Sequence, residues 1–168
     1  MGHEMVHRRG LIHKICGTAA YFKMMYSHFY IEHLRLHHKK VATPEDPQTS
    51  RLNESLYQYF WRAIPEGYID VWRYETARIR EQGLDKLWQK ILYNRLITLS
   101  AAQFAYLALI WVIFGPRAFT FHVIISFLNI LMFEAINYLE HYGLERNLVP
   151  GSDTVYESVK ISHSWNAP

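Results

Sequence analysis

Six histidines in three short clusters are the residues of this 168-residue chain whose types and spacing could do chemistry. The clusters read HEMVH, EHLRLHH and NYLEHYGL, and each places a glutamate directly beside a histidine. Neutral imidazole is the commonest protein metal ligand, and a nearby carboxylate can orient the ring and fix its tautomer. The predicted metal ligands are His3, His7, His33, His37, His38 and His141, and the carboxylates predicted to support them are Glu4, Glu32 and Glu140.

The spacing within the clusters would bring ring nitrogens together. His3 and His7 stand four residues apart, as do His33 and His37, so each pair would project from one face of a helix. Six imidazoles exceed the three protein ligands of a catalytic zinc site, so two redox metals fit this number better, and iron suits imidazole. HEMVH also matches the HExxH zinc-protease motif, with Glu4 as general base, but that interpretation leaves the other two clusters unexplained.

Composition narrows the class of protein and the kind of metal site. The formal net charge is +3 and the basic residues are scattered, a pattern that does not indicate nucleic-acid binding. Cys16 is the only cysteine, which excludes an intrachain disulfide and a cage of thiolate ligands. The first residues lack the regions of a signal peptide, and the chain stops at SHSWNAP, so we expect an internal fragment of a longer protein.

Helices must position these clusters, and the first half of the chain predicts several. Residues 1–40 read as helical, whereas residues 41–53 read as a loop because two prolines and small polar residues fill them. Residues 54–90 form an amphipathic helical pattern rich in Tyr and Trp, with one break expected at 65–67 and another at Gly83. Aromatic and basic residues mixed in this way suit the headgroup layer of a membrane, and a soluble helical pair is the alternative.

The next segment decides between these alternatives. No charged residue lies between Arg95 and Arg117, and this stretch is long enough to cross a hydrocarbon core of ~30 Å. A tight turn is expected at Gly115, and a second apolar run follows it to about Tyr138. The two runs predict a helical hairpin through the membrane. Such a hairpin returns the chain to the face it left, so His141 would emerge on the same side as the first two clusters.

Together these segments predict an all-α integral membrane helical bundle with the histidine clusters on helices at one membrane face. Its expected parts are residues 1–94, with histidine-cluster and interfacial helices, residues 95–140, with the transmembrane hairpin, and residues 141–168, with the third cluster. Polar side chains on the second apolar run fall within about 140° of arc, which indicates a face turned to the protein interior. They are His122, Ser126, Asn129, Glu134, Asn137, Glu140 and His141.

Some of these polar residues have a simpler explanation. We interpret His13, His122 and His163 as isolated, hydrogen-bonded structural histidines. His28 is left open, because it lies four residues before Glu32 and a pair with that carboxylate would explain it.

The three clusters and their surroundings resemble the membrane-bound alkane 1-monooxygenases, a family of non-haem di-iron hydroxylases. HEMVHR resembles the first histidine box of the family, HELxHK, and EHLRLHH resembles the second, EHxxGHH. NYLEHYGL fits the pattern NYxEHYGL at every specified position, and VATPEDP follows the second box. Leu36 stands where the second box has glycine, Leu34 where asparagine is expected, and Arg8 where the first box has lysine. The likeness covers nearly the whole chain.

The resemblance implies a reaction and its partners. It implies two non-haem irons held by the six histidines, and O₂-dependent hydroxylation of the terminal methyl group of medium- and long-chain alkanes. A rubredoxin-like protein would supply electrons, docking on basic residues such as Arg8, Arg9, Lys39 and Lys40. The histidine boxes would lie at the cytoplasmic face of a multi-pass membrane protein. A fourth box, of the form LQRHSDHH, is expected beyond Pro168, so these 168 residues would hold most of the iron ligands but not a complete site.

Three alternatives stay open. Xylene-type monooxygenases share the HELxHR and HYGL features but oxidise methyl groups on aromatic rings, and the second box followed by VATPEDP favours the alkane branch. Membrane fatty-acid desaturases and hydroxylases are related by the same histidine boxes. The third alternative is an inactive membrane protein that retains the scaffold, which iron content and alcohol formation would distinguish from the enzymes.

Overall fold

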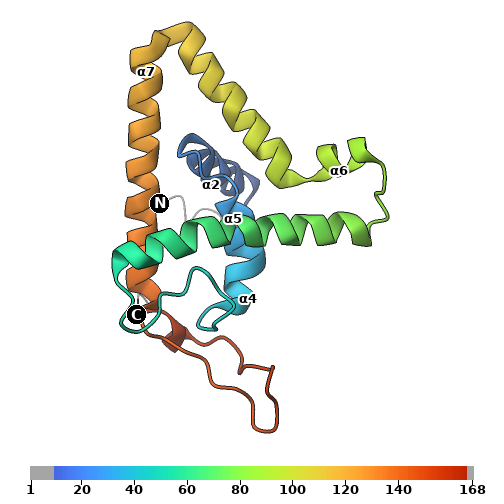
Figure 1. The fold of residues 1–168 in the computed structure, drawn as a ribbon, viewed down its shortest axis with the longest axis vertical. Helices are drawn as coiled ribbons and strands as arrows, with labels where there is room; N and C mark the ends of the chain where they lie inside the picture. Colours follow the sequence, from blue (N-terminus) through green and yellow to red (C-terminus); the bar gives the residue numbers. More distant parts are fainter. Residues whose placement is uncertain (1–9, 166–168) are drawn as a thin grey trace.

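The computed structural model describes residues 10–165, and apart from one isolated antiparallel bridge between Leu148 and Tyr156 its regular elements are helical. In chain order the helices are α2 (Leu11–Lys23), α3 (Phe29–Ile31), the π-helix η1 (Glu32–His37), α4 (His38–Lys40), α5 (Leu56–Glu81), α6 (Leu87–Tyr93), α7 (Arg95–His141) and the 3₁₀-helix η2 (Ile161–His163). Figure 1 shows α7 bent into two arms, with α5 lying across their open end. The prediction of an all-helical fold is confirmed for the described residues.

The bend in α7 lies where the sequence predicted a turn between two apolar runs. At Gly115 φ is 79° and ψ is 177°, a combination that is essentially restricted to glycine, and Pro116 follows it. The 47-residue helix begins at Arg95, and the preceding Asn94 caps it, because its side chain accepts hydrogen bonds from the backbone N–H groups of Leu96 and Ile97.

The surface of α7 is mostly apolar and mostly exposed. Within residues 10–165, α7 is the helix long and apolar enough to cross a membrane. Its exposed side chains include Phe104, Val112, Phe114, Phe121 and Ile124, which lie on both arms. Large exposed apolar surfaces, such as this one along both arms, mark regions that contact another protein or a membrane.

α5 continues through the position where a break was expected. A capping box starts it: Ser55 Oγ accepts from the backbone N–H of Gln58 (3.3 Å), and Gln58 Oε1 accepts from that of Ser55 (2.9 Å). The helix then runs through Pro65 and Gly67 to Glu81, so the predicted break at 65–67 is wrong. The expected break at Gly83, where φ is +66°, is confirmed.

Packing explains why α5 survives its proline. Ala63, Gly67 and Val71 lie on its buried face, and tertiary packing of that face outweighs weak local propensity. Gly67 allows the close approach, because a Cβ atom there would lie only 2.2 Å from Glu32 Oε1. The glycine that suggested a break therefore serves contact between α5 and η1.

α2 ends between the two arms of α7 (Figure 1), and polar side chains of both arms form hydrogen bonds with its last residues and with Ser27. Gln103 Nε2 donates to the carbonyl of Phe22 (3.0 Å), and Ser126 Oγ donates to that of Lys23 (3.3 Å). Ser27 Oγ completes the set by donating to Gln103 Oε1 (2.9 Å). The first two contacts add side-chain donors to carbonyl groups in the last turn of α2 and so tie its end to both arms of α7.

Arg62 of α5 fixes the loop that follows α4. Its guanidinium donates to the carbonyl oxygens of Pro47 (2.9 Å) and Thr49 (3.0 Å) and forms two bonds of 2.7 Å with the carboxylate of Glu54. The carboxylate bonds lower the pKa of Glu54, although burial alone would raise it. The loop is thus held against α5 on one side and places Asp46 against His37 on the other.

Candidate metal centre

A π-helix brings two histidines of the second cluster together. Glu32–His37 is π-helical, so residues five apart, rather than four, come into register along this segment. The Nε2 atoms of His33 and His38 lie 3.0 Å apart as a result. The ring of His37 stacks beside that of His33, with centroids 5.3 Å apart. All three histidines of the cluster therefore meet, but with a pairing that the four-residue spacing did not predict.

His37 is oriented by a carboxylate from the following loop. Its Nδ1 donates to Asp46 Oδ2 at 2.8 Å, and both side chains are buried. Thr49 Oγ1 donates to the same carboxylate oxygen (2.6 Å), and the backbone N–H of Gln48 donates to Oδ1 (3.3 Å). Burial lowers the pKa of His37, but the Asp46 charge and hydrogen bond outweigh it and raise the pKa overall. The carboxylate that holds His37 is therefore Asp46 of the following loop, not Glu32 of the same cluster.

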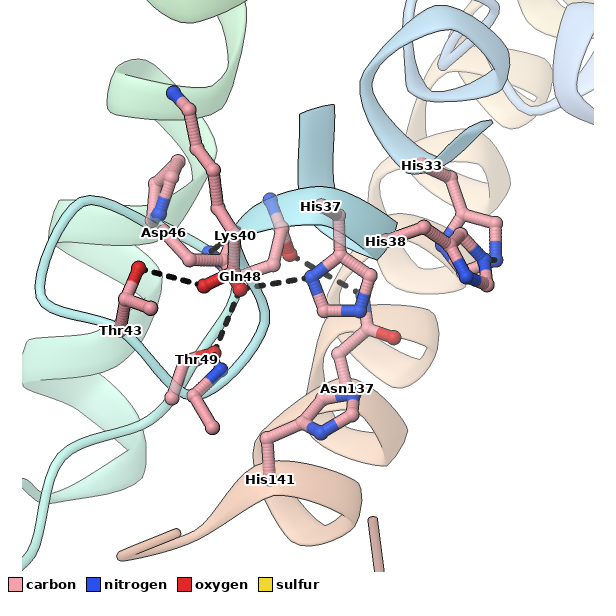
Figure 2. A network of polar contacts seen from close by, with 12 residues as sticks. His33, His37, His38, Lys40, Thr43, Asp46, Gln48, Thr49, Asn137 and His141 are labelled. Atoms are coloured by element: carbon pink, nitrogen blue, oxygen red, sulfur yellow. Dashed lines mark hydrogen bonds and ion pairs between the residues drawn. The ribbon is translucent and has the colours of Figure 1, made fainter. Parts of the chain in front are cut away.

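His141 meets this group from the end of α7. Its ring centroid lies 4.8 Å from that of His37, and Figure 2 shows His37 between Asp46 and His141. The Nδ1 of His141 donates to the backbone carbonyl of His163 (3.0 Å). That bond places the proton of a neutral ring on Nδ1 and leaves Nε2 as the electron-pair donor. Glu140 Oε2 lies 3.9 Å from this Nε2.

These rings line one cavity of about 250 Å³. Its wall includes His33, His37, His38, His141 and His163, together with Glu140 and Lys160. The prediction that the second and third clusters meet is supported by this shared cavity. His3, Glu4 and His7 of the first cluster lie outside the described residues.

His163 was interpreted as an isolated structural histidine, and its place in the cavity wall was missed. Its Nδ1 accepts from the backbone N–H of Lys160 (2.9 Å), so a neutral ring carries its proton on Nε2. In that form Nε2–H is a hydrogen-bond donor in the cavity wall, and the backbone carbonyl of His163 orients His141. The segment ESVKISHSW offers no spacing from which either contact could be inferred.

A polar network lies beside the histidines. Gln48 Nε2 donates to Glu32 Oε1 (2.8 Å), and Gln48 Oε1 accepts from Asn137 Nδ2 (3.2 Å). The carboxylate of Glu134 accepts from the hydroxyls of Tyr26 (2.7 Å) and Tyr59 (2.9 Å). Burial raises the pKa of Glu32 well above its usual range. Gln48 thus bonds one oxygen of Glu32, and the other oxygen, Oε2, has no hydrogen-bond partner in the described residues. His28 Nε2 has none either, so a pair with Glu32 does not explain that histidine.

The donor set fits a transition metal. His37 and His141 each use Nδ1 for an anchoring hydrogen bond, the arrangement that fixes ring orientation in metal sites and leaves Nε2 for the ion. Within residues 10–165 no three His, Cys, Asp or Glu side chains yet stand in a coordination geometry. The sole cysteine, Cys16, is exposed on α2, so nitrogen and oxygen are the donors available at the cavity.

Comparison with known proteins places the chain among relatives. The model of the fatty acid desaturase family matches residues 1–168. Alkane 1-monooxygenase 1 of Pseudomonas aeruginosa is 34% identical over 99% of this chain and 42% of its own length. The alkane 1-monooxygenase of Acinetobacter baylyi is 36% identical over 98% and 39%. The xylene/toluene monooxygenase hydroxylase component XylM of Pseudomonas putida is 25% identical over 99% and 42%. The chain thus spans about two-fifths of the length of these curated relatives.

Proposed function

The chain belongs to the fatty acid desaturase family, and on that premise we propose that it carries part of the catalytic region of an O₂-dependent alkane hydroxylase. The product would be the primary alcohol of a medium- or long-chain alkane. Seven relatives of 32–36% identity bear the name alkane 1-monooxygenase, which supports this choice of reaction. The observation that carries it is the cavity where His33, His37, His38 and His141 meet from two separate parts of the chain.

The proposed cofactor is a pair of non-haem irons. The ligands from this chain would be His3, His7, His33, His37, His38 and His141. When bound, the irons would supply the redox chemistry that uses O₂ and two electrons to place one oxygen atom on an unactivated carbon.

The protein's own side chains would keep these ligands ready. The Asp46 carboxylate holds His37, and the His163 carbonyl holds His141, so both rings would turn Nε2, rather than Nδ1, to the metal. Glu32 and Glu140 stand next to ligands, as does Glu4 in the sequence, and we assign them supporting roles behind the metals. The buried Tyr59 and Glu134 would limit the access of water to the side of the site that faces α5.

The membrane part of the proposal rests on α7. From Arg95 to Gly115 the first arm rises about 30 Å, the thickness of a hydrocarbon core, so each arm would cross the bilayer once. The histidines would then lie at the cytoplasmic face, where an alkane dissolved in the bilayer can reach them. A rubredoxin-like donor would dock beside Lys39. Lys40 is engaged with Asp70 at 2.6 Å, and Arg8 and Arg9 lie outside the described residues.

The test is product formation by the full-length protein in lipid. Loaded with iron and given O₂, a reduced rubredoxin and octane, it should release 1-octanol with one oxygen atom from ¹⁸O₂. The same assay with p-xylene examines the alternative suggested by XylM, and a benzylic alcohol as the main product would favour it. No product from either substrate, with iron bound, would overturn the proposal and favour an inactive relative.

A further inference from the structure

A second cavity, distinct from the histidine cavity, is an apolar groove between α5 and the second arm of α7. Its volume is about 710 Å³, within the range of small-ligand sites. The wall consists of Tyr57, Phe60, Trp61, Ile64, Pro65, Tyr68 and Ile69 of α5, Phe127 and Leu131 of α7, and His28. Apart from His28, the tyrosine hydroxyls and the indole N–H of Trp61, these side chains offer a ligand only hydrocarbon surface.

His28 is a polar group left without a partner in that wall. The residue is 8% exposed, and its Nε2 atom is buried with no hydrogen bond. Its ring packs edge-on against Tyr26 and Tyr68, with centroid distances of 4.6 and 5.1 Å, and neither contact satisfies the nitrogen. Leaving a buried polar atom unpaired is costly, so an unpaired one beside a groove indicates a ligand that completes it.

The groove also lies next to the proposed reaction site. His28 directly precedes Phe29, whose ring stacks on that of His33 at a centroid distance of 5.2 Å. His33 in turn lines the histidine cavity. A residue of the groove wall, His28, is therefore the chain neighbour of a residue that packs against the histidine cavity, while Phe127 on the other wall is exposed on a membrane-length arm.

We propose that this groove binds a linear primary alcohol, with the alkyl chain along the wall of α5 and the hydroxyl hydrogen-bonded to His28 Nε2. The inference rests on the proposed function, since such an alcohol is the expected product, and it assigns the groove to product on its way to the bilayer. An alkane would fill the same wall but leave Nε2 unpaired. Burial lowers the pKa of His28 to about 4, so its ring is neutral near pH 7 and suits a hydroxyl better than a carboxylate.

A photolabelling experiment tests the inference without turnover. The probe is a twelve-carbon primary alcohol with a mid-chain diazirine, applied to the full-length protein in phosphatidylcholine nanodiscs. Label should appear in the α5 peptide that contains residues 57–69. Dodecan-1-ol should displace it at about one-tenth of the concentration that dodecane needs, the factor expected for one additional hydrogen bond.

Substitutions then locate the polar contact. His28→Phe should abolish the advantage of the alcohol over the alkane, and His28→Gln should restore part of it. His122→Phe is the matched control, because His122 lies on α7 against Tyr106 outside the groove, and it should behave as wild type. Ile64→Trp should reduce labelling by filling the groove.

Three results would overturn the inference. They are equal displacement by dodecane and dodecan-1-ol in the wild-type protein, label confined to other helices, or an unchanged alcohol advantage in a folded His28→Phe protein. The first two need no variant, so misfolding of His28→Phe cannot protect the inference. Labelling of the groove without any hydroxylation would contradict the proposed function and leave the alcohol site standing. Hydroxylation without labelling of the groove would contradict the alcohol site and leave the proposed function standing.

Discussion

The histidine end of the molecule and the bent arms of α7 differ in what they keep inside and what they expose: the first buries polar side chains, and the second exposes apolar ones. At the histidine end Glu32, Asp46 and Gln48 are at most 2% exposed, and each has a hydrogen-bond partner. Along the arms Phe104 and Val112 are 69% and 78% exposed. The first region is held by polar contacts within the protein, and the second presents its apolar atoms outward. One chain therefore combines an interior suited to metal ligands with an exterior suited to a bilayer.

Removal of a ligand at the histidine end should have the largest effect. We expect His37→Ala and His141→Ala each to lower iron affinity by more than about 100-fold, because removing a ligand should cost more than removing its hydrogen-bond partner. Iron per chain and 1-octanol formation measure this. His122→Ala, a change of the same kind on α7, should leave both unchanged. If the His37→Ala protein kept its full iron content, the claim that the histidine end holds the metal would be contradicted.

A charge placed on the arms should have the next largest effect. Phe104→Lys lies near the middle of the first arm and should cost about 2.5–3.5 kcal/mol in a bilayer, whereas an exposed site in water would tolerate it. Glycosylation-tag assays measure the free energy of inserting this segment into the membrane. Val155→Lys, at an exposed apolar position in the segment after α7, is the control and should be neutral. Equal tolerance at the two positions would argue that the arms do not lie in lipid.

The support of His37 should have an intermediate effect. Asp46→Asn keeps the shape of the side chain but removes the charge that holds His37 Nδ1–H, and iron affinity should fall roughly 10–100-fold. Competition with an iron chelator measures this change. Glu45→Gln alters the exposed neighbouring carboxylate and should leave the affinity as it was. Unchanged affinity in Asp46→Asn would mean that Asp46 serves the loop alone.

The smallest effect is expected at the link between α5 and the start of the first arm of α7. The carboxylate of Glu75 on α5 accepts from Arg78 (2.8 Å) and from Arg95 at the start of α7 (2.6 Å). Burial raises the pKa of Glu75, but these hydrogen bonds outweigh it and hold the pKa below its usual range. Its contribution to stability is therefore complete above the unfolded pKa of about 4.3 and is lost as the pH falls through the lower, folded value.

Melting temperature against pH measures that contribution. Between pH 5 and pH 3 the wild-type protein should lose more stability than Glu75→Gln, which has no charge to lose. Glu81→Gln, at an exposed position of the same helix, should follow the wild type. Parallel curves for wild type and Glu75→Gln would show that the pair with Arg95 does not link α5 to α7.

Local chemistry made part of this structure predictable from the sequence. The turn at Gly115 needed a glycine conformation and two flanking apolar runs, and both are visible in the letters. The histidine clusters were likewise visible, because their spacing is local. The break predicted at Pro65 was wrong, because packing of the buried face of α5 outweighed the local effect of a proline.

Contacts across the chain were not predictable in the same way. Nothing in EHLRLHH indicates a π-helix, so the approach of His38 to His33 was not foreseen. Asp46 was visible only as part of a loop, because its contact with His37 depends on how Arg62 holds that loop against α5. The carbonyl of His163 reaches His141 from 22 residues away.

The most direct test of the account is X-ray absorption at the iron edge of the full-length protein in lipid, together with an iron count. We expect two irons per chain, each with nitrogen and oxygen neighbours at about 2.0–2.2 Å and the outer-shell scattering of imidazole rings. The Asp46→Asn protein, prepared and measured in the same way, should show weaker imidazole scattering than the wild-type protein. A single bound zinc, sulfur neighbours, or iron without imidazole scattering would contradict the assignment of this cavity to a histidine-held iron pair.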